Sequence, residues 1–128
     1  MNIYDLTVEE RVDNGWRWLD ENFPGWQERV NIFNLYLNEA TRCICGQLFR
    51  GKGGYSGYEY AERHLFAEAN SWISAVIPQD EPYRELQVRV YLGFWSDHDG
   101  EVDPVSWKDL QAEWERRLSA WHVEAVSV

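Results

Sequence analysis

The chain has 128 residues, 45% of them hydrophobic and 16% aromatic, which is enough apolar material for one folded domain over 1–128 and argues against disorder. Its 22 acidic residues against 12 basic ones give a formal net charge of −10, which disfavours direct binding to nucleic acid phosphates. The sequence has no run of 18 apolar residues and no secretory signal pattern, so we expect no membrane segment and a cytoplasmic protein with reduced cysteines.

A first helix is predicted from Val8 to about Asn22. Thr7 and Glu10 have the spacing of a capping box, and Pro24-Gly25 ends the segment. Gly15 inside this helix costs about 1 kcal/mol relative to alanine, so either a neighbour packs closely there or the helix is locally weak. The apolar residues at helical spacing are Val8, Val12, Trp16, Leu19 and Phe23.

The next part of the chain is predicted to contain a connection and a central helix. Residues 26–37 change their apolar spacing from three to two, which favours a short extended or 3₁₀ segment. Residues 39–50 return to helical spacing, and the glycine-rich run 51–57 then stops that helix.

Ser56 and Glu59 form a second capping-box pattern, and helical periodicity continues from there to Pro78. We therefore predict one long helix over this stretch. The residues that carry the periodicity are Tyr58, Ala61, Leu65, Ala69, Trp72, Ile73 and Val76.

Two interpretations compete for residues 82–94. Strict alternation of apolar residues from Leu86 to Phe94 is typical of a strand. Pro82 suits a helix start, and Tyr83, Leu86 and Val90 also match helical spacing. A strand would need a pairing partner, for which 30–37 is the best available segment.

The last helix is predicted to begin after Ser106 as N-cap, with a tail from His122 to Val128. Its apolar stripe consists of Trp107, Leu110, Trp114, Leu118 and Trp121. The predicted fold is a compact, mainly α domain of four or five helices, and the alternative is an α+β domain with one short β-hairpin.

Two motifs resemble ligand loops but lack required residues. Residues 46–52 fit the first seven positions of a P-loop, but Gly53 stands where Ser or Thr must hold magnesium. Residues 97–103 resemble a calcium loop, but Val102 and Lys108 occupy the positions of the required glycine and glutamate. We therefore assign no cofactor and no metal.

The cysteines and histidines give no catalytic signature. Cys43 and Cys45 are two residues apart, which on a helix points them in different directions and disfavours a shared metal or a disulfide. Both are interpreted as core residues. Pairing of either with His64, His98 or His122 has no local motif behind it, so no catalytic residue is assigned.

The eight tryptophans exceed what a core of this size requires. Five lie on predicted apolar faces and are assigned to the core: Trp16, Trp72, Trp107, Trp114 and Trp121. Trp18, Trp26 and Trp95 are left as a possible partner surface, because tryptophan is enriched at protein interfaces.

Several short motifs resemble a group of small uncharacterised proteins of actinobacteria and their phages. These motifs are Pro24-Gly25-Trp26, Ile32 with Leu35 and Leu37, Cys43-Ile44-Cys45-Gly46-Gln47-Leu48-Phe49, Leu92-Gly93-Phe94, and Leu110 with Trp114. Cys45 departs from the aliphatic residue usual in that group, and Arg50 separates Phe49 from Gly51. The resemblance implies a phage or prophage origin and a helix over 82–92, and it carries no activity or catalytic residue.

Three functional hypotheses follow. The first is a small phage-type protein that binds a host protein without catalysis, the second an acidic DNA mimic that blocks a host DNA-binding protein, and the third an enzyme that uses Cys43 or a histidine. The oligomeric state and the identity of the host protein are left open.

Overall fold

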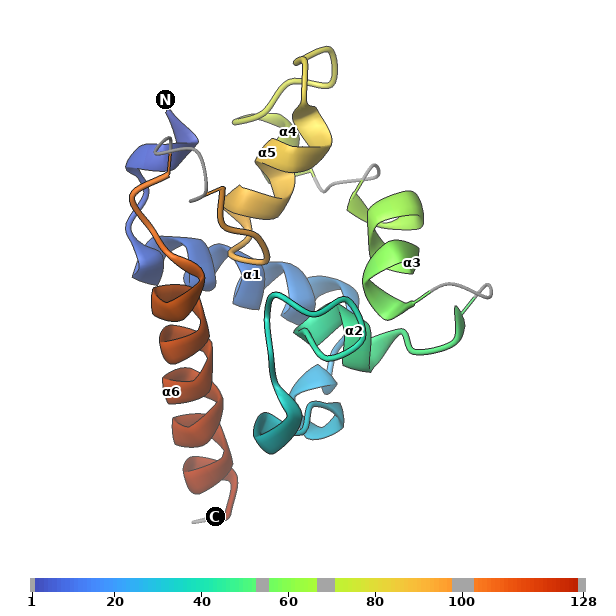
Figure 1. Cartoon of the computed structure of the whole chain (residues 1–128), viewed down its shortest axis with the longest axis vertical. Helices are drawn as coiled ribbons and strands as arrows, with labels where there is room; N and C mark the ends of the chain where they lie inside the picture. The colour runs from blue at the N-terminus through green and yellow to red at the C-terminus, as the bar shows by residue number, and fades with distance from the viewer. Residues whose placement is uncertain (1, 53–55, 67–70, 98–102, 127–128) are drawn as a thin grey trace.

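Residues 2–52, 56–66, 71–97 and 103–126 are described by the computed structural model of the chain (Figure 1). After a 3₁₀ turn at Ile3–Asp5, helix α1 spans Val8–Asn22. Thr7 and Glu10 make both hydrogen bonds of the capping box, as predicted for the start of this helix. The predicted end at about Asn22 is confirmed as well.

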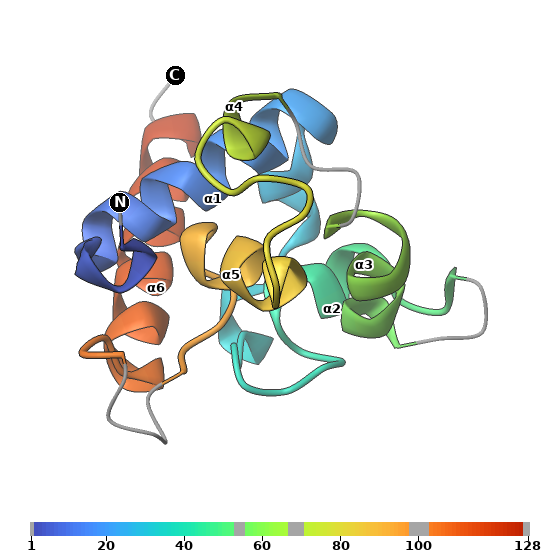
Figure 2. The same cartoon turned by 90° about the horizontal axis from the view of Figure 1, so that it is seen from above.

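Helix α6, Trp107–Val126, packs against α1 and crosses it (Figures 1 and 2). A Cβ atom on Gly15 would lie 2.0 Å from the Leu92 carbonyl oxygen and 2.9 Å from Cζ2 of Trp114. Close packing therefore explains this glycine. The tail predicted from His122 is wrong as far as Val126, because no glycine or proline interrupts the helix there.

The predicted central helix is shorter than expected. Helix α2 spans Ile44–Leu48, and residues 36–43 form turns closed by a hydrogen bond from the Tyr36 amide to the Arg42 carbonyl. Cys43 is the N-cap, and its Sγ accepts a hydrogen bond from the Gly46 amide at 3.2 Å. A cap at Cys43 fixes the helix start, so the prediction of a helix from residue 39 is wrong.

The long helix predicted up to Pro78 is also wrong, because it is divided. Helix α3 spans Gly57–His64 after the Ser56 cap, and helix α4 spans Ser71–Ser74. Phe66 is 1% exposed and packs against Trp18 and Phe94, with ring centroids 5.6 and 5.9 Å away. Phe66 is not among the residues of the predicted apolar stripe, yet it is buried just after α3 ends.

Residues Arg84–Tyr91 form helix α5, which decides between the two interpretations of that segment. No strand occurs among the residues that the structure describes, and the β-hairpin is absent from them. The 3₁₀ prediction is confirmed by two short turns, Trp26–Arg29 and Ile32–Asn34. The chain is thus a compact, mainly α-helical domain.

A tryptophan cluster and one buried ion pair hold this arrangement. Trp114 is fully buried, stacks with Phe94 at 5.6 Å between ring centroids and donates from Nε1 to the Gly93 carbonyl at 2.8 Å. Both guanidinium ends of Arg11 donate to Asp103 at 2.8 Å, with neither side chain exposed. Within the described residues, no helix has the length and apolarity needed to cross a membrane.

Candidate functional site: an aromatic groove beside helix α6

Two of the three tryptophans assigned to a partner surface lie in the core. Trp18 is 2% exposed and Trp26 is fully buried. Trp26 donates from Nε1 to Asp20 and packs edge-on against Trp16, with ring centroids 4.9 Å apart. Neither can form part of a surface of the folded chain, which corrects that assignment. Trp95 is half-buried and borders a pocket.

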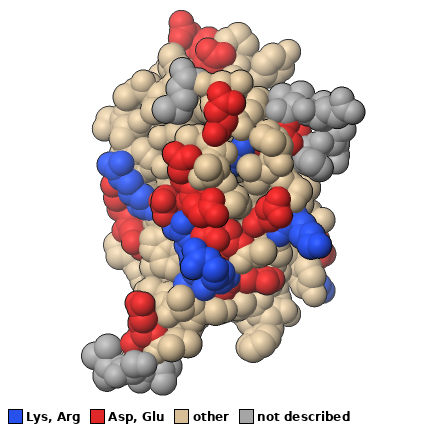
Figure 3. All heavy atoms as spheres, turned by 90° about the vertical axis from the view of Figure 1, so that its left-hand side faces the viewer, with Lys and Arg blue, Asp and Glu red and all other residues tan. Residues whose placement is uncertain are grey.

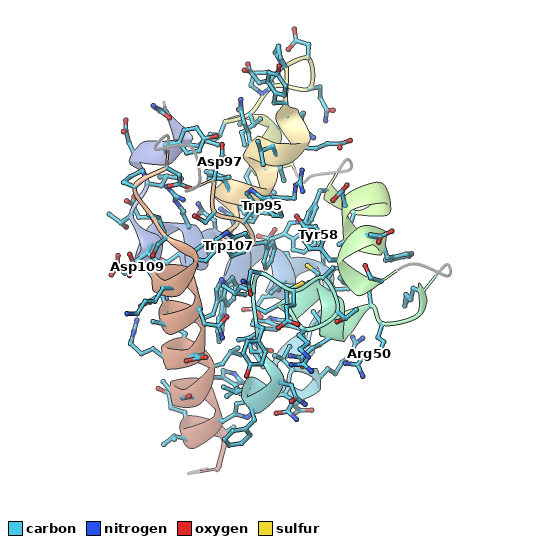
Figure 4. All side chains as sticks on the ribbon, in the orientation of Figure 1. Arg50, Tyr58, Trp95, Asp97, Trp107 and Asp109 are labelled. Atoms are coloured by element: carbon cyan, nitrogen blue, oxygen red, sulfur yellow. The ribbon has the colours of Figure 1, made fainter. Side chains whose placement is uncertain are left out.

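The pocket at Trp95 has aromatic walls and a volume of about 230 Å³. Tyr58 stacks with Trp95 at 6.1 Å between ring centroids, and Trp107 meets Trp95 edge-on at 5.2 Å. Figure 4 shows these three side chains converging from α3, from the segment after α5 and from the start of α6. Leu37 and Ala40 add apolar lining.

Arg89 supplies the positive charge of this pocket. Its guanidinium lies 5.1 Å from the Trp95 ring centroid and 5.9 Å from that of Tyr58, within cation–π range. Arg89 Nη1 donates to the Tyr58 hydroxyl at 2.8 Å and to Glu62 at 3.3 Å. Burial raises the pKa of Tyr58 far above its ordinary value, so its hydroxyl stays neutral at physiological pH.

Two further pockets continue from the first along α6. One of about 230 Å³ shares Leu37, Asn38 and Trp107 with it, and one of about 360 Å³ then shares Tyr36 and Glu115. We call this joined row the aromatic groove, after its five aromatic side chains: Phe33, Tyr36, Tyr58, Trp95 and Trp107.

Gln111 fixes one wall of the aromatic groove to α6. Its Oε1 accepts from the Leu37 amide at 2.8 Å, and its Nε2 donates to the Leu35 carbonyl at 2.5 Å. Nε2 also donates to Glu115 at 2.7 Å, which orients the amide. The side chain thus binds the 35–37 backbone much as a neighbouring strand would.

The local chain geometry explains why Phe33 and Tyr36 point outward. Asn31 caps the 3₁₀ turn by accepting from the Phe33 amide at 3.0 Å. Leu35 and Leu37 are 2% and 4% exposed, so the core lies on their side of the chain and the intervening Tyr36 faces away from it. Phe33 is 93% exposed and Tyr36 is 46% exposed.

The cysteines are not poised for chemistry. Cys43 and Cys45 are free thiols that are 4% and 1% exposed. Burial raises the pKa of Cys43 to about 11 and the pKa of Cys45 well above its ordinary value. Nucleophilic cysteines need an accessible thiolate, which neither residue provides.

Among the histidine side chains that the structure describes, none lies against these thiols. The side chains of His64 and His98 lie outside the described residues, and His122 packs against the Trp121 ring on α6. No group of three or more His, Cys, Asp or Glu side chains is placed to hold a metal among the described residues.

The two loop-like motifs have structural roles where the structure describes them. Gly46 lies within α2, and a Cβ there would be 2.5 Å from the Ala40 carbonyl oxygen, so packing explains this glycine. Residues 98–102 of the calcium-like loop lie outside the described residues. Asp103 at its end is engaged by Arg11 and by the amides of Asp97 and Val105.

Sequence reasoning missed four of the five side chains of the aromatic groove. The sequence places Trp107 in the core and Tyr58 on an apolar helix face, where Tyr58 is indeed buried, and it gives no role to Phe33 or Tyr36. One signal was available: Tyr36 alternates with Leu35 and Leu37, which indicates opposite directions in extended chain.

These side chains form a surface suited to binding apolar groups, with one arginine and one glutamate in the pocket at Trp95. Comparison of the chain with family models, curated proteins and solved structures gives no match in any of the three.

Proposed function

We propose that this chain is a non-catalytic protein-binding module whose aromatic groove takes an apolar segment of a partner protein. The observation that carries the proposal is that Phe33 and Tyr36, 93% and 46% exposed, extend a row of aromatic side chains onto the surface. Neighbouring exposed apolar side chains mark interaction sites, and aromatic residues are enriched at binding hot spots.

The shape of the groove supports a polypeptide segment as occupant. Two of its three pockets measure about 230 Å³, below the roughly 300–1,000 Å³ typical of small-molecule sites. Joined in a row, they suit successive side chains of one extended segment. The resemblance to actinobacterial phage proteins suggests a host protein as the partner, which makes the module one that acts by occupying its target.

DNA mimicry is the second candidate, and its support is the net charge of −10. A mimic presents unneutralised charge, whereas acidic and basic side chains lie interleaved on the α6 side of this molecule (Figure 3). Glu113 receives hydrogen bonds from both Arg116 and Arg117, and Arg17 pairs with Glu21 at 2.9 Å. Because much of this charge is neutralised by pairing, DNA mimicry has less support than binding of a partner protein in the aromatic groove.

The test is capture of a partner from an actinobacterial host lysate by tagged wild type and by Phe33→Ala/Tyr36→Ala. Wild type should retain a host protein through washes in 1 M salt, because apolar burial depends little on ionic strength. The double variant should lose it.

Tyr83→Asn is the matched control. It removes another aromatic side chain, 81% exposed and outside the aromatic groove, and asparagine accepts the left-handed backbone at φ 63°. This control should capture the partner like wild type. Two outcomes would contradict the proposal. One is that the double variant captures as much partner as wild type, and the other is that the partner stays bound in low-salt washes but is lost in 1 M salt.

A further inference from the structure

A second groove lies between the C-terminal halves of α1 and α6, with a volume of about 580 Å³. On each helix, the residues that line this groove recur at helical spacing over nine positions, which corresponds to about 12 Å of helix at roughly 1.5 Å per residue. The α1 wall is Asp13, Trp16, Arg17, Asp20 and Glu21, and the α6 wall is Arg116, Arg117, Ala120, Trp121 and Glu124.

The floor of this α1–α6 groove is apolar and preorganised. Trp16 is half-buried and held from behind by Trp26 and Trp114, with ring centroids 4.9 and 6.4 Å away. Trp121 is half-buried, and beside it Ala120 is exposed and small enough for a close approach. Two helix faces separated by such a floor form the seat that a third helix occupies in bundle packing.

The charges of the groove are unevenly satisfied. Its three arginines all have carboxylate partners: Arg17 binds Glu21, Arg116 binds Glu113, and Arg117 binds both Glu113 and Asp13. Asp20 accepts from the neutral side chains of Trp26 and Gln27. Across the described residues, neither Asp20 nor Glu124 has a basic side chain within ion-pair distance.

We propose that the α1–α6 groove binds a basic amphipathic helix of a partner protein, independently of the aromatic groove. The apolar side of that helix packs on Trp16, Ala120 and Trp121, and its lysines or arginines pair with Asp20 and Glu124. The net charge of −10 attracts such a helix and repels a second copy of this chain.

The probe is a dye-labelled 18-residue helical peptide of leucine and lysine, with a leucine–glutamate peptide as its counterpart. Fluorescence anisotropy gives the affinity, and the indole N–H signals of Trp16 and Trp121 in NMR spectra give the location. The lysine peptide should bind and shift both indole signals, whereas the glutamate peptide should not bind.

Three variants locate the binding. Asp20→Asn/Glu124→Gln should weaken it roughly three- to tenfold, the size expected for two exposed ion pairs. Ala120→Phe fills the floor at an exposed position and should weaken it more than about tenfold. Asp80→Asn/Glu81→Gln removes two exposed charges outside the groove, and it should bind like wild type within about twofold.

Phe33→Ala should also leave peptide binding unchanged, which separates this site from the aromatic groove. Absence of binding, equal weakening by the two charge variants, or indole shifts unaffected by Ala120→Phe would each overturn the proposal. Self-association of the chain that Ala120→Phe abolishes would overturn it too, because a second copy would then be the occupant.

Discussion

The two grooves lie on opposite sides of α6 and differ in what their side chains offer to a partner. At about 3.6 residues per turn, Gln111 and Glu115 face one side of the helix, Ala120 and Glu124 face the other, and Trp114 lies between. The aromatic groove presents apolar rings of which Phe33 is almost fully exposed. The α1–α6 groove presents charges, most of which are already paired.

This difference shows that net charge alone does not identify which surface of the molecule binds a partner. Exposed ion pairs contribute about 0–1 kcal/mol each, and salt screens them. The exposed rings of Phe33 and Tyr36 offer apolar area to a partner, and the binding that such area gives survives at high ionic strength. The proposed function therefore rests on the aromatic groove, and the separately proposed binding of a basic helix in the α1–α6 groove is expected to be sensitive to salt.

The largest expected effect comes from Trp114, which supports the helix between the grooves. Trp114→Ala removes a fully buried side chain that contacts Trp16, Trp26 and Phe94. We expect a loss of about 3–5 kcal/mol in unfolding free energy, measured by urea denaturation. A loss below about 1 kcal/mol would mean that the helix does not depend on this residue.

The Arg11–Asp103 pair allows the stability cost of losing a buried ion-pair partner to be compared with the cost of losing an exposed one in the α1–α6 groove. Arg11→Met leaves a buried carboxylate without its cation and should cost about 3 kcal/mol or more, whereas Arg17→Gln should cost less than about 1 kcal/mol. Arg11→Met/Asp103→Asn should recover part of the loss, because no unpaired charge remains. Additive losses in the double variant would contradict this coupling.

The same pair predicts a pH dependence. Burial alone would raise the pKa of Asp103, but hydrogen bonds from Arg11, Val105 and Asp97 outweigh it and hold the pKa below its ordinary value. The unfolded chain therefore binds the proton more readily, so the stability contribution is complete above about pH 5 and is lost as pH falls through the depressed value. Acid titration of unfolding free energy should show this loss in wild type and a smaller one in Arg11→Met/Asp103→Asn.

The next effect concerns Cys43, close to the Ala40 carbonyl beside the aromatic groove. Its pKa of about 11, against an ordinary 9.0, lowers the thiolate fraction at pH 8 about 100-fold. Native protein should react with a thiol reagent at least about 100-fold more slowly than protein unfolded in urea. Equal rates would restore the enzyme hypothesis, and Cys43→Ser would then identify the reacting residue.

The smallest expected effect on stability is that of Phe33. Phe33→Ala changes a side chain that is 93% exposed, so the unfolding free energy should stay within about 0.5 kcal/mol of wild type. The same denaturation measurement checks it. A loss above about 1 kcal/mol would assign Phe33 to folding rather than to a binding surface.

The helices with strong local signals could be predicted from sequence. Thr7 with Glu10 and Ser106 with its apolar stripe placed α1 and α6, because caps and periodicity are local properties. The end of α3 at His64 has no such local signal; it coincides with burial of Phe66 against the distant side chains of Trp18 and Phe94.

Of the three tryptophans that the sequence analysis proposes as a partner surface, Trp95 lies in the candidate site, and Trp18 and Trp26 lie in the core. The burial of Trp18 and Trp26 depends on side chains from other elements, such as Phe66 for Trp18 and Trp114 for Trp26. Phe33 is exposed because Asn31 starts a 3₁₀ turn at that point. Residue type alone cannot tell which of the eight tryptophans lie in the core, because tryptophan is found both buried and partly exposed.

The most direct test of the proposed function is the salt dependence of the dissociation constant for the purified pair of this protein and its captured partner. We expect a change of less than about tenfold between 0.05 and 1 M salt, because apolar contacts carry the binding. Phe33→Ala/Tyr36→Ala should weaken binding by at least about tenfold at every salt concentration. A loss of several decades between low and moderate salt, with that variant binding like wild type, would contradict the proposal and favour the DNA mimic.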